Sequence, residues 1–326
     1  MIAVPGDLTV RQFFGEYYAP RRLVDASEAT LRNWRNLFSA LDRWRGGMLV
    51  RELEEDTIED FLAWLAQHGH ARSTADNPRG LAPATRNLHL RNLCTLWRLA
   101  WRRRIREELG RDAPAYSIDP DWLKWDAKAR VMKRAPIAWT REDLGALFSA
   151  MESTPGTLHG VPAGEWWRAL GGVLLYTGWR ISSVMLLPRN ALVGSCRLRV
   201  PAEITKERAE GCRLVDKRTG SILEKLNYDE RGERRGRLFA WPYDAAGAPW
   251  KTLRNHFDRI TERAGLDRRN ADKTFHRFRI THGTLVAIAG GDASLSLNHS
   301  NPRYTSRYLD LPRVRQPSAV DLIGEI

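Results

Sequence analysis

Hydrophobic residues recur at helical spacing through the first hundred residues of the chain. The pattern predicts three helices, over residues 8–18, 27–44 and 57–67. Ser27 or Thr30 is the candidate N-cap of the second helix, because a hydroxyl there can accept a bond from an unpaired backbone N–H. With the helix described next, these segments predict a helical domain over residues 8–110.

A fourth, amphipathic helix is predicted to begin near Pro83. Its apolar face carries Leu90, Leu93, Leu96, Trp97, Ala100 and Trp101. The flank of the other side carries Asn87, Arg91, Arg98 and Arg102. Such a stripe of arginine suits a helix that lies along a DNA backbone, so these four residues are candidate DNA contacts. An ordinary solvated face would give the same pattern.

Residues 111–138 interrupt the helical pattern and are typical of a linker. Three prolines punctuate the segment: Pro114, Pro120 and Pro136. Five cationic side chains make it basic: Lys124, Lys128, Arg130, Lys133 and Arg134. A basic connection between two domains suits a passage over DNA, and it equally suits a plain tether.

A second domain is predicted over residues 139–326, beginning with a capping box formed by Thr140 and Asp143. Helical spacing predicts helices over residues 166–176, 250–264 and 274–289. Alternation across residues 195–216 predicts a small antiparallel sheet, built on Leu198, Val200, Ile204, Cys212 and Leu214. The expected fold class is therefore mainly α, with a small antiparallel β-sheet in the C-terminal domain.

Composition narrows the class of partner. The chain has 326 residues, enough for two domains, and 43% of them are hydrophobic, as in ordinary globular proteins. A net charge of +13 favours a polyanion such as nucleic acid, although a basic solvated surface would have the same charge. No apolar run is long enough to span a membrane and no signal peptide is recognisable, so we expect a cytoplasmic protein. The three cysteines lack metal-site spacing, which predicts free thiols and no zinc.

The residues that carry chemistry lie mostly near the C-terminus. His276 and Arg279 form a His-x-x-Arg motif, His299 follows, and Tyr308 stands nine residues after His299. Arg180 lies about a hundred residues upstream, after Thr-Gly-Trp. A tyrosine can attack phosphorus, two guanidinium groups can hold the non-bridging oxygens, and imidazoles can move protons. This grouping predicts a protein that cuts and rejoins DNA without a metal ion.

In their order and helical context, these residues resemble those of the tyrosine recombinases, also called phage integrases. The resemblance covers nearly the whole chain, with residues 8–110 similar to the helical, SAM-like core-binding domain and 139–326 similar to the catalytic domain. It implies a two-domain DNA clamp with a basic linker over 111–138. No arm-binding domain is expected ahead of residue 8, which resembles the compact Xer-like layout.

The resemblance also implies residue roles. Arg180 and Arg279 match the two arginines that clamp the phosphate, and Tyr308 matches the nucleophile. A phenol is protonated at neutral pH, so its attack needs nearby positive charge and a proton acceptor. Tyr304 is the rival nucleophile, but the spacing from His299 favours Tyr308.

The remaining catalytic positions are two histidines and a lysine. His276 matches the family's histidine beside the second arginine, which accepts the tyrosyl proton or donates a hydrogen bond to the phosphate. His299 matches a position that forms hydrogen bonds. The family uses a hairpin lysine as general acid to the 5′-hydroxyl leaving group. Lys206 fits best and Lys217 is the alternative.

Two positions depart from the family pattern. Ser183 stands where the family has an acidic residue, three residues after Arg180, which predicts weakened or retuned activity. The stretch between Arg279 and His299 is shorter than usual, and Asn298 takes the place of a glycine before the histidine. Asparagine tolerates the left-handed backbone conformation, and the local loop is expected to differ from that of the family.

The resemblance implies a site-specific DNA recombinase that forms a 3′-phosphotyrosyl intermediate and needs no cofactor, metal ion or ATP. Its expected partners are a double-stranded DNA site and three further copies of the chain, in a tetramer on two duplexes. Residues 315–326 are expected to dock on a neighbouring protomer. The alternatives are a type IB topoisomerase, which shares the chemistry, and a recombinase-derived protein that only binds DNA.

Overall fold

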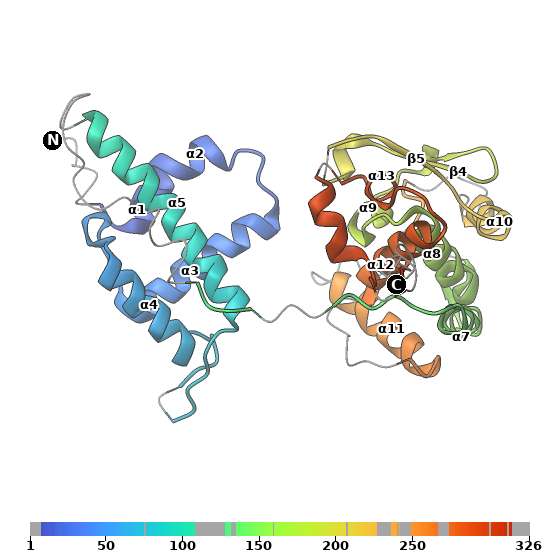
Figure 1. The fold of residues 1–326 in the computed structure, drawn as a ribbon, viewed down its shortest axis with the longest axis horizontal. Coiled ribbons are helices and arrows are strands. Elements are labelled where there is room, and N and C mark those ends of the chain that lie inside the picture. The colour runs from blue at the N-terminus through green and yellow to red at the C-terminus, as the bar shows by residue number, and fades with distance from the viewer. Residues whose placement is uncertain are drawn as a thin grey trace, which may run out of the picture. The chain divides into compact units, whose positions relative to one another are not determined.

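A computed structural model describes the chain in segments: residues 8–74, 76–107, 128–131, 135–158, 160–206, 208–226, 236–239, 241, 249–266, 274–299, 301–311 and 313–314. The chain divides into two compact units, Met1–Lys133 and Arg134–Ile326, each with its own hydrophobic core (Figure 1).

The first unit is helical, as the hydrophobic spacing predicts. Its helices are α1 (Val10–Phe13), α2 (Ala19–Arg22), α3 (Glu28–Arg45), α4 (Glu55–Gln67) and α5 (Pro83–Glu107). A π-helical segment, Phe14–Tyr18, joins α1 to α2. The helix predicted over residues 8–18 is therefore π-helical in its second half, and it continues to Arg22. Ser27 is the N-cap of α3 and accepts from the backbone N–H of Thr30 at 3.3 Å.

Aromatic rings and leucines fill the core of this unit. The Phe14 ring contacts those of Trp34 and Phe38, each at a centroid distance of 4.8 Å. The apolar face predicted for α5 is buried at Leu90, Leu93, Leu96, Trp97 and Ala100. Burying each large apolar side chain stabilises the fold by about 1.5–3 kcal/mol, and this holds α5 in place. Its other flank is left for polar residues.

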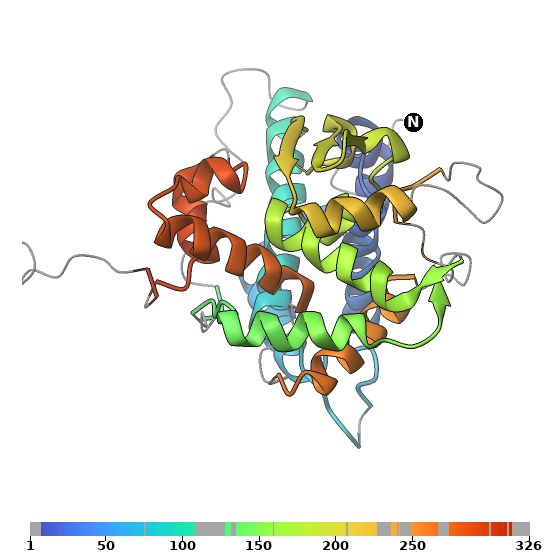
Figure 2. The ribbon, with the colours of Figure 1, turned by 90° about the vertical axis from the view of Figure 1, so that its right-hand side faces the viewer.

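The second unit is built mainly from helices around α8. These are α7 (Arg141–Glu152), α8 (Ala163–Thr177), α9 (Ile181–Met185), α10 (Lys217–Leu226), α11 (Pro249–Arg263), α12 (Thr274–Ile288) and α13 (Ala293–Ser296). Thr140 and Asp143 form the predicted capping box of α7, with both bonds at 2.9 Å. Almost every side chain of α8 is buried, and the helix packs against α7, α10 and α12 (Figure 2).

Two small antiparallel sheets complete the second unit. One pairs β1 (Thr157–Leu158) with β2 (Val161–Pro162), and the other has the order β3 (Leu192–Val193), β4 (Arg197–Val200), β5 (Gly211–Leu214). The sheet predicted across residues 195–216 is therefore present, and β3 extends it. The assignment of Ile204 to a strand was wrong. It ends a 3-10 turn, Ala202–Ile204, because Pro201 closes β4 before it can continue.

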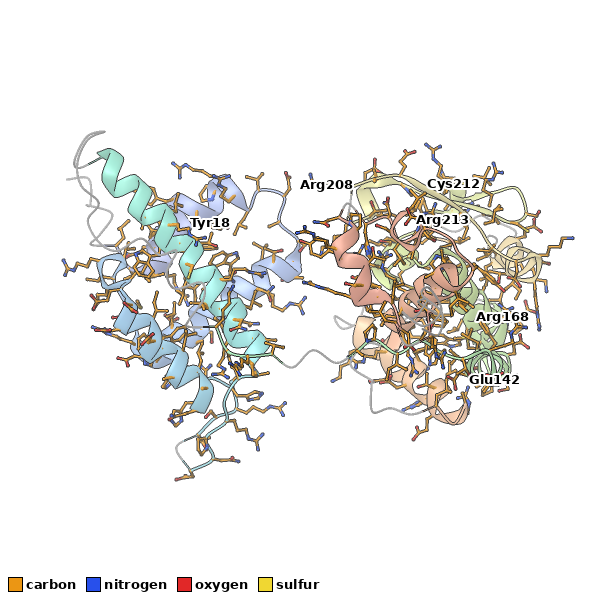
Figure 3. All side chains as sticks on the ribbon, viewed as in Figure 1. Tyr18, Glu142, Arg168, Arg208, Cys212 and Arg213 are labelled. Carbon is orange, nitrogen blue, oxygen red and sulfur yellow. The ribbon has the colours of Figure 1, made fainter. Side chains whose placement is uncertain are left out.

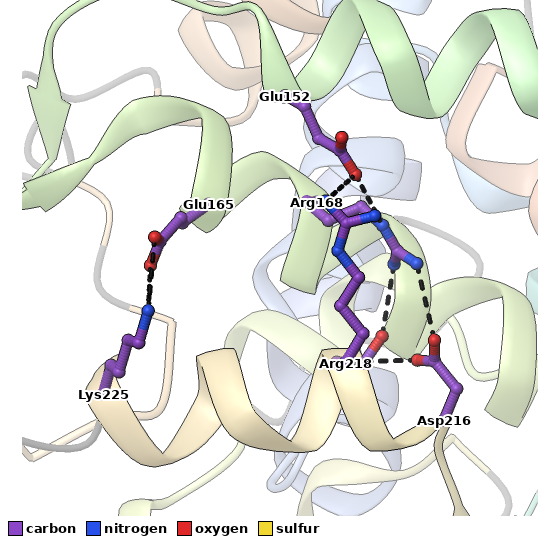
Figure 4. A network of polar contacts seen from close by, with 7 residues as sticks. Glu152, Glu165, Arg168, Asp216, Arg218 and Lys225 are labelled. Carbon is purple, nitrogen blue, oxygen red and sulfur yellow. Dashed lines mark hydrogen bonds and ion pairs between the residues drawn. The ribbon is translucent and has the colours of Figure 1, made fainter.

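A buried arginine ties α8 to its neighbours. Arg168 is 8% exposed and pairs with Glu152 at 3.2 Å and with Asp216 at 3.4 Å (Figure 4). Arg218 shares Glu152 at 3.0 Å, and Arg168 also lies over the Phe148 ring at 4.2 Å. The network joins α7, α8 and the start of α10 through charge as well as apolar packing.

Several predictions fall on parts of the chain outside the described residues. These parts are most of the linker, residues 108–127 and 132–134, the side chains of Trp101 and Arg102, and the tail, residues 315–326. Among the helices that are described, none combines the length and apolar character needed to cross a membrane.

Candidate active site

Four of the predicted catalytic residues come together around one tyrosine ring. Tyr308 is the last residue of a 3-10 helix, Pro302–Tyr308. Its ring centroid lies 5.0 Å from that of His276 and 4.7 Å from that of His299. The guanidinium carbon of Arg279 lies 5.2 Å from the same ring. Helix α12, which carries His276 and Arg279, and the stretch from His299 to Tyr308 therefore meet at this ring.

Arg279 is the most deeply placed of these groups, at 3% exposed. It lies in the first half of α12, and its fork is fixed by backbone oxygens. One terminal nitrogen donates to the carbonyl of Gly178 at 2.7 Å, and the other donates to the carbonyl of Leu297 at 2.5 Å. The second nitrogen is also 3.0 Å from Nε2 of His299. The guanidinium plane is thus oriented before any ligand arrives.

Gly178 places Arg180 next to this fork. It ends α8 in the left-handed conformation, with φ +64°, and a Cβ there would lie 2.5 Å from the ring of His282. Only glycine permits both the backbone angle and this close approach to α12. Arg180 follows as the N-cap of α9 and lines a pocket together with Arg279. The two arginines predicted to clamp a phosphate therefore share one pocket.

The hydrogen bonds of His299 define its tautomer. Arginine can only donate, so Nε2 of His299 accepts from Arg279. The proton of the neutral ring is then on Nδ1, which lies 3.0 Å from the hydroxyl of Thr305. Thr305 is one turn before Tyr308 on the same 3-10 helix, so His299 links Arg279 to the segment that carries the tyrosine.

The turn before His299 is held by a helix cap and a left-handed residue. Asp292 caps the short helix α13, accepting from the backbone N–H groups of Ser294 and Leu295 at 2.7 and 3.0 Å. Asn298 has φ +52°, a left-handed conformation that asparagine tolerates. The backbone N–H of His299 then donates to the carbonyl of Ser294 at 3.0 Å. The shortened stretch therefore still brings His299 to Tyr308.

His282, on α12, supports the site through hydrogen bonds to α8 and to the end of α13. Its Nδ1 donates to the carbonyl of Leu175 on α8 at 2.7 Å, and its Nε2 lies 2.6 Å from the hydroxyl of Ser296. Burial lowers the pKa of His282, and the positive charges of Arg213 and Arg279 add to this effect. A neutral ring therefore joins α8, α12 and the end of α13.

Lys206 lies on the loop between β4 and β5, and its side chain is exposed. The hydroxyl of Thr205 bonds both the carbonyl and the N–H of Ala209 at 3.0 Å, which closes the loop. Arg208, labelled in Figure 3, has φ +50° at the bend. Thr205 lines the pocket of the two arginines, so Lys206 is adjacent in sequence to a pocket residue. Lys217, the alternative, begins α10 and does not line this pocket.

Ser183, at the position of the family's acid, is buried on α9 and lines the same pocket. Its hydroxyl donates to the carbonyl of Ile204 at 2.9 Å. Ile204 is two residues before Lys206, so this neutral bond ties the lysine loop to the helix that Arg180 begins. A carboxylate could not make it, since an ionised acid has no proton to donate.

Tyr304, the rival nucleophile, lies apart from this cluster. Its side chain is 49% exposed, and its ring contacts the guanidinium of Arg307 at 5.3 Å. Tyr308 has both histidines and Arg279 around it instead. The geometry favours Tyr308.

The four candidate DNA contacts on α5 differ in their surroundings. Arg91 is exposed and Arg98 is half-buried. Asn87 uses its amide on the chain itself: it donates to the carbonyl of Ala129 at 2.9 Å and accepts from the N–H of Ala129 at 3.0 Å. Asn87 therefore holds the backbone near the end of the first unit. The side chain of Arg102 lies outside the described residues.

Sequence reasoning missed three residues of the site. His282 follows Arg279 by three residues, so helical periodicity could have placed it on the same side of α12. Arg213, on β5 opposite Leu198, lines the pocket of Arg180 and Arg279 (Figure 3). Thr305 contacts His299. Neither of the last two carries a signal in one sequence. No three His, Cys, Asp or Glu side chains gather as a metal site within the part of the chain that the structure describes.

Comparison with protein families matches part of the first unit. The phage integrase SAM-like domain family matches residues 9–110, which lie within Met1–Lys133. The helical domain predicted from hydrophobic spacing, residues 8–110, spans nearly the same stretch. No curated protein matches the chain.

Solved structures of two integrases and a site-specific recombinase match most of the chain. A transposon Tn1549 integrase in complex with a circular intermediate DNA is 16% identical, with a TM-score of 0.62, over 97% of this chain and 98% of that one. A lambda integrase dimer bound to a core site is 15% identical, with a TM-score of 0.59, over 92% and 95%. The recombinase XerH bound to its difH substrate is 16% identical, with a TM-score of 0.54, over 85% and 73%.

At these identities the matches establish the fold. The chain has the two-domain tyrosine recombinase fold: a phage integrase SAM-like domain followed by a mainly helical domain with small antiparallel sheets. The resemblance drawn from the catalytic motifs is therefore confirmed for the first domain and for the architecture.

Proposed function

We propose that this protein is a site-specific DNA recombinase that cuts and rejoins DNA through a phosphotyrosyl intermediate. The phenol oxygen of Tyr308 attacks a DNA phosphorus, the bond to the 5′-oxygen breaks, and a 3′-phosphotyrosyl link forms. The free 5′-hydroxyl of a partner duplex then attacks that link and releases the tyrosine. One phosphoester replaces another in each step, so the reaction needs no ATP.

The side chains of the pocket divide the work of this reaction. Arg180 and Arg279 bind the non-bridging oxygens and offset the charge that develops on them. His276 takes the phenolic proton, and His299 orients Arg279 through its Nε2. Lys206 gives a proton to the leaving 5′-oxygen. The role of Ser183 is to hold the loop of Lys206 through Ile204.

One observation carries the proposal: the ring of Tyr308 lies against His276, His299 and Arg279 at once. Ring and cation–π contacts stabilise any packed tyrosine. Here they also place positive charge and a proton acceptor beside the phenol, which a tyrosine nucleophile needs.

The partner we propose is double-stranded DNA. Residues 8–110 and 139–326 would clamp the duplex, with the basic segment 111–138 between them, and Arg91, Arg98 and Arg102 would contact phosphates. Four protomers on two duplexes would form the working assembly, with residues 315–326 docking in trans. A lambda integrase tetramer bound to a Holliday junction, 16% identical to this chain over 95% of its length with a TM-score of 0.61, supports this stoichiometry. A net charge of +13 supports the choice of ligand.

The same reasoning gives a location. A protein whose substrate is chromosomal or mobile-element DNA acts where that DNA is, in the cytoplasm at the nucleoid. A fluorescent fusion that follows the DNA stain supports this placement, and one that avoids the stain contradicts it.

The proposal is tested by trapping. The protein is incubated with a library of nicked duplexes, so that cleavage releases a short fragment and strands the covalent adduct. Adducts are isolated under denaturing conditions and their DNA is sequenced, which gives the site and the chemistry together. The wild type should yield adducts with one sequence motif. Tyr308→Phe should yield none, because phenylalanine keeps the ring and lacks the attacking oxygen.

The trapping experiment also separates the alternatives. A protein that binds DNA without any adduct is a binder only. A topoisomerase forms the adduct and relaxes supercoils, yet exchanges no strands between two sites. Gel shifts with a truncation of residues 315–326 test the tail: unchanged assembly on DNA contradicts docking in trans.

A further inference from the structure

The pocket of Arg180 and Arg279 holds a third guanidinium group, that of Arg213 on β5. Arg213 was not predicted as a site residue. Its side chain is half-buried and approaches the end of α13. Two roles are open to a third arginine in such a place. It can bind the phosphate directly, or it can hold another group that does.

The donors of Arg213 distinguish these roles. One terminal nitrogen donates to the carbonyls of Leu295 and Ser296, at 3.2 and 3.1 Å. The other donates to the carbonyl of Cys212 at 2.9 Å. Both arms of the fork are therefore engaged with backbone oxygens. These bonds support the holding role. Direct binding of the phosphate would instead appear in the dissociation constant, which the test below measures.

The backbone that Arg213 holds is the turn that presents His299. Arg213 bonds the carbonyls of Leu295 and Ser296, and Arg279 bonds the next carbonyl, that of Leu297. Three successive backbone oxygens are thus fixed by two guanidinium groups that approach from β5 and from α12. The left-handed residue Asn298 and then His299 follow directly. These oxygens lie at the C-terminal end of α13, where positive charge is favoured.

We infer that Arg213 is a positioning residue for the proposed cleavage reaction: it fixes the turn 295–298 and thereby holds His299 against Arg279 and Tyr308. The inference rests on the proposed function, because it assigns Arg213 a part in that same site. Its consequence is specific. Without Arg213 the turn is held from one side only, and His299 no longer occupies one position.

The test uses the full-length protein and a nicked duplex carrying the site found by trapping. Adduct formation is followed in single turnovers, and the dissociation constant is measured by gel shift. Arg213→Ala should slow cleavage roughly 10- to 100-fold, the usual cost of displacing a reacting group by about 1 Å. The dissociation constant should stay within about threefold of wild type. Arg213→Gln keeps one side-chain NH₂ group as a donor, so its cleavage rate should fall less than that of Arg213→Ala.

The decisive arm is a double-mutant cycle with His299→Ala. If Arg213 acts through His299, Arg213→Ala adds no more than about threefold to the loss already caused by His299→Ala. An undiminished loss in that background overturns the inference, and so does a loss that appears mainly in the dissociation constant. Arg218→Ala removes the same charge from α10 and should leave the cleavage rate unchanged, since Arg218 does not line the pocket.

A modified substrate tests whether Arg213 acts through the loop of Lys206 instead of through His299. With sulfur in place of the bridging 5′-oxygen, the leaving group needs no proton, so Lys206→Ala should recover its rate. Arg213→Ala should not recover; if it does, Arg213 acts through the loop of Lys206 and the inference is wrong. Absence of any wild-type adduct contradicts the proposed function itself, whereas a wild-type adduct with additive losses contradicts the role of Arg213 alone.

Discussion

Two buried arginines of the second unit, Arg168 and Arg279, are bonded in different ways. Arg168 is 8% exposed and pairs with the carboxylates of Glu152 and Asp216. Arg279 is 3% exposed and donates to the carbonyls of Gly178 and Leu297. Carboxylates neutralise a guanidinium, whereas carbonyl oxygens orient it and leave its charge in place.

The difference separates structural from chemical use of the same side chain. A neutralised arginine joins helices, and the network around Arg168 does so for α7, α8 and α10 (Figure 4). An oriented arginine can act on a further anion, because its fork already has the required plane. Substitution of Arg279 should therefore lower the cleavage rate, whereas substitution of Arg168 should lower the stability of the fold.

The largest effect is expected at Arg279. Arg279→Lys should lower the cleavage rate by about 10²- to 10³-fold, because an ammonium group cannot donate in the plane of a fork. Single-turnover trapping measures the rate, and circular dichroism on heating measures stability. Comparable cleavage by Arg279→Lys would remove the distinction between the two arginines.

Arg168→Met should act on stability instead. It leaves Asp216 without this partner and Glu152 with Arg218 alone, and both carboxylates are about one-third exposed. The expected loss is therefore about 2–3 kcal/mol of unfolding free energy. Urea unfolding measures this loss. The folded fraction should cleave the nicked duplex at the wild-type rate. Slower cleavage per folded molecule would mean that Arg168 takes part in the reaction.

A smaller, pH-dependent effect is expected at His282. Burial lowers the pKa of this histidine, so the unfolded chain takes up the proton first as the pH falls. Stability is therefore lost as the pH drops below about 6.5, by less than about 1.4 kcal/mol per pH unit.

Comparison of two proteins isolates the contribution of His282. The urea midpoint of the wild type should fall between about pH 7.5 and about pH 5.5, and that of His282→Gln should fall less. His89 and His256, whose pKa values burial also lowers, are present in both proteins and cancel. Equal slopes would mean that His282 is not held neutral by the fold.

The smallest effect is expected at Tyr304. Tyr304→Phe removes a hydroxyl from an exposed ring and should leave adduct formation within about twofold of wild type. Loss of the adduct in this variant, together with its retention in Tyr308→Phe, would show that Tyr304 is the nucleophile and Tyr308 is not.

The helical spacing of the first unit could be predicted from the sequence because each helix buries a regular apolar stripe. Phe61 and Leu65 on α4, and Leu93 and Leu96 on α5, are fully or almost fully buried. The π-helical segment at Phe14 was not predictable, since its winding depends on how neighbouring aromatic rings pack. The strand at Leu192 was missed because two residues are too few for an alternation to appear.

For the candidate site, residue types with distinctive chemistry could be predicted and their supports could not. His276, Arg279, His299 and Tyr308 were found through motif spacing, and the structure brings them together. Asn87 was predicted as a DNA contact on helical position alone. Its bonds to Ala129 depend on where a distant backbone passes, which no periodicity encodes.

The groups that hold this site have a genetic consequence. Arg213, Arg279 and His282 all donate to main-chain oxygens, at Leu295, Ser296, Leu297, Gly178 and Leu175. Every amino acid carries that oxygen, so a point mutation at an acceptor position changes the side chain and keeps the bond. In a saturation screen, Leu297 should accept other apolar residues, whereas Arg279 should accept none. Gly178 is the exception among the acceptors, because a Cβ there would lie 2.5 Å from the ring of His282.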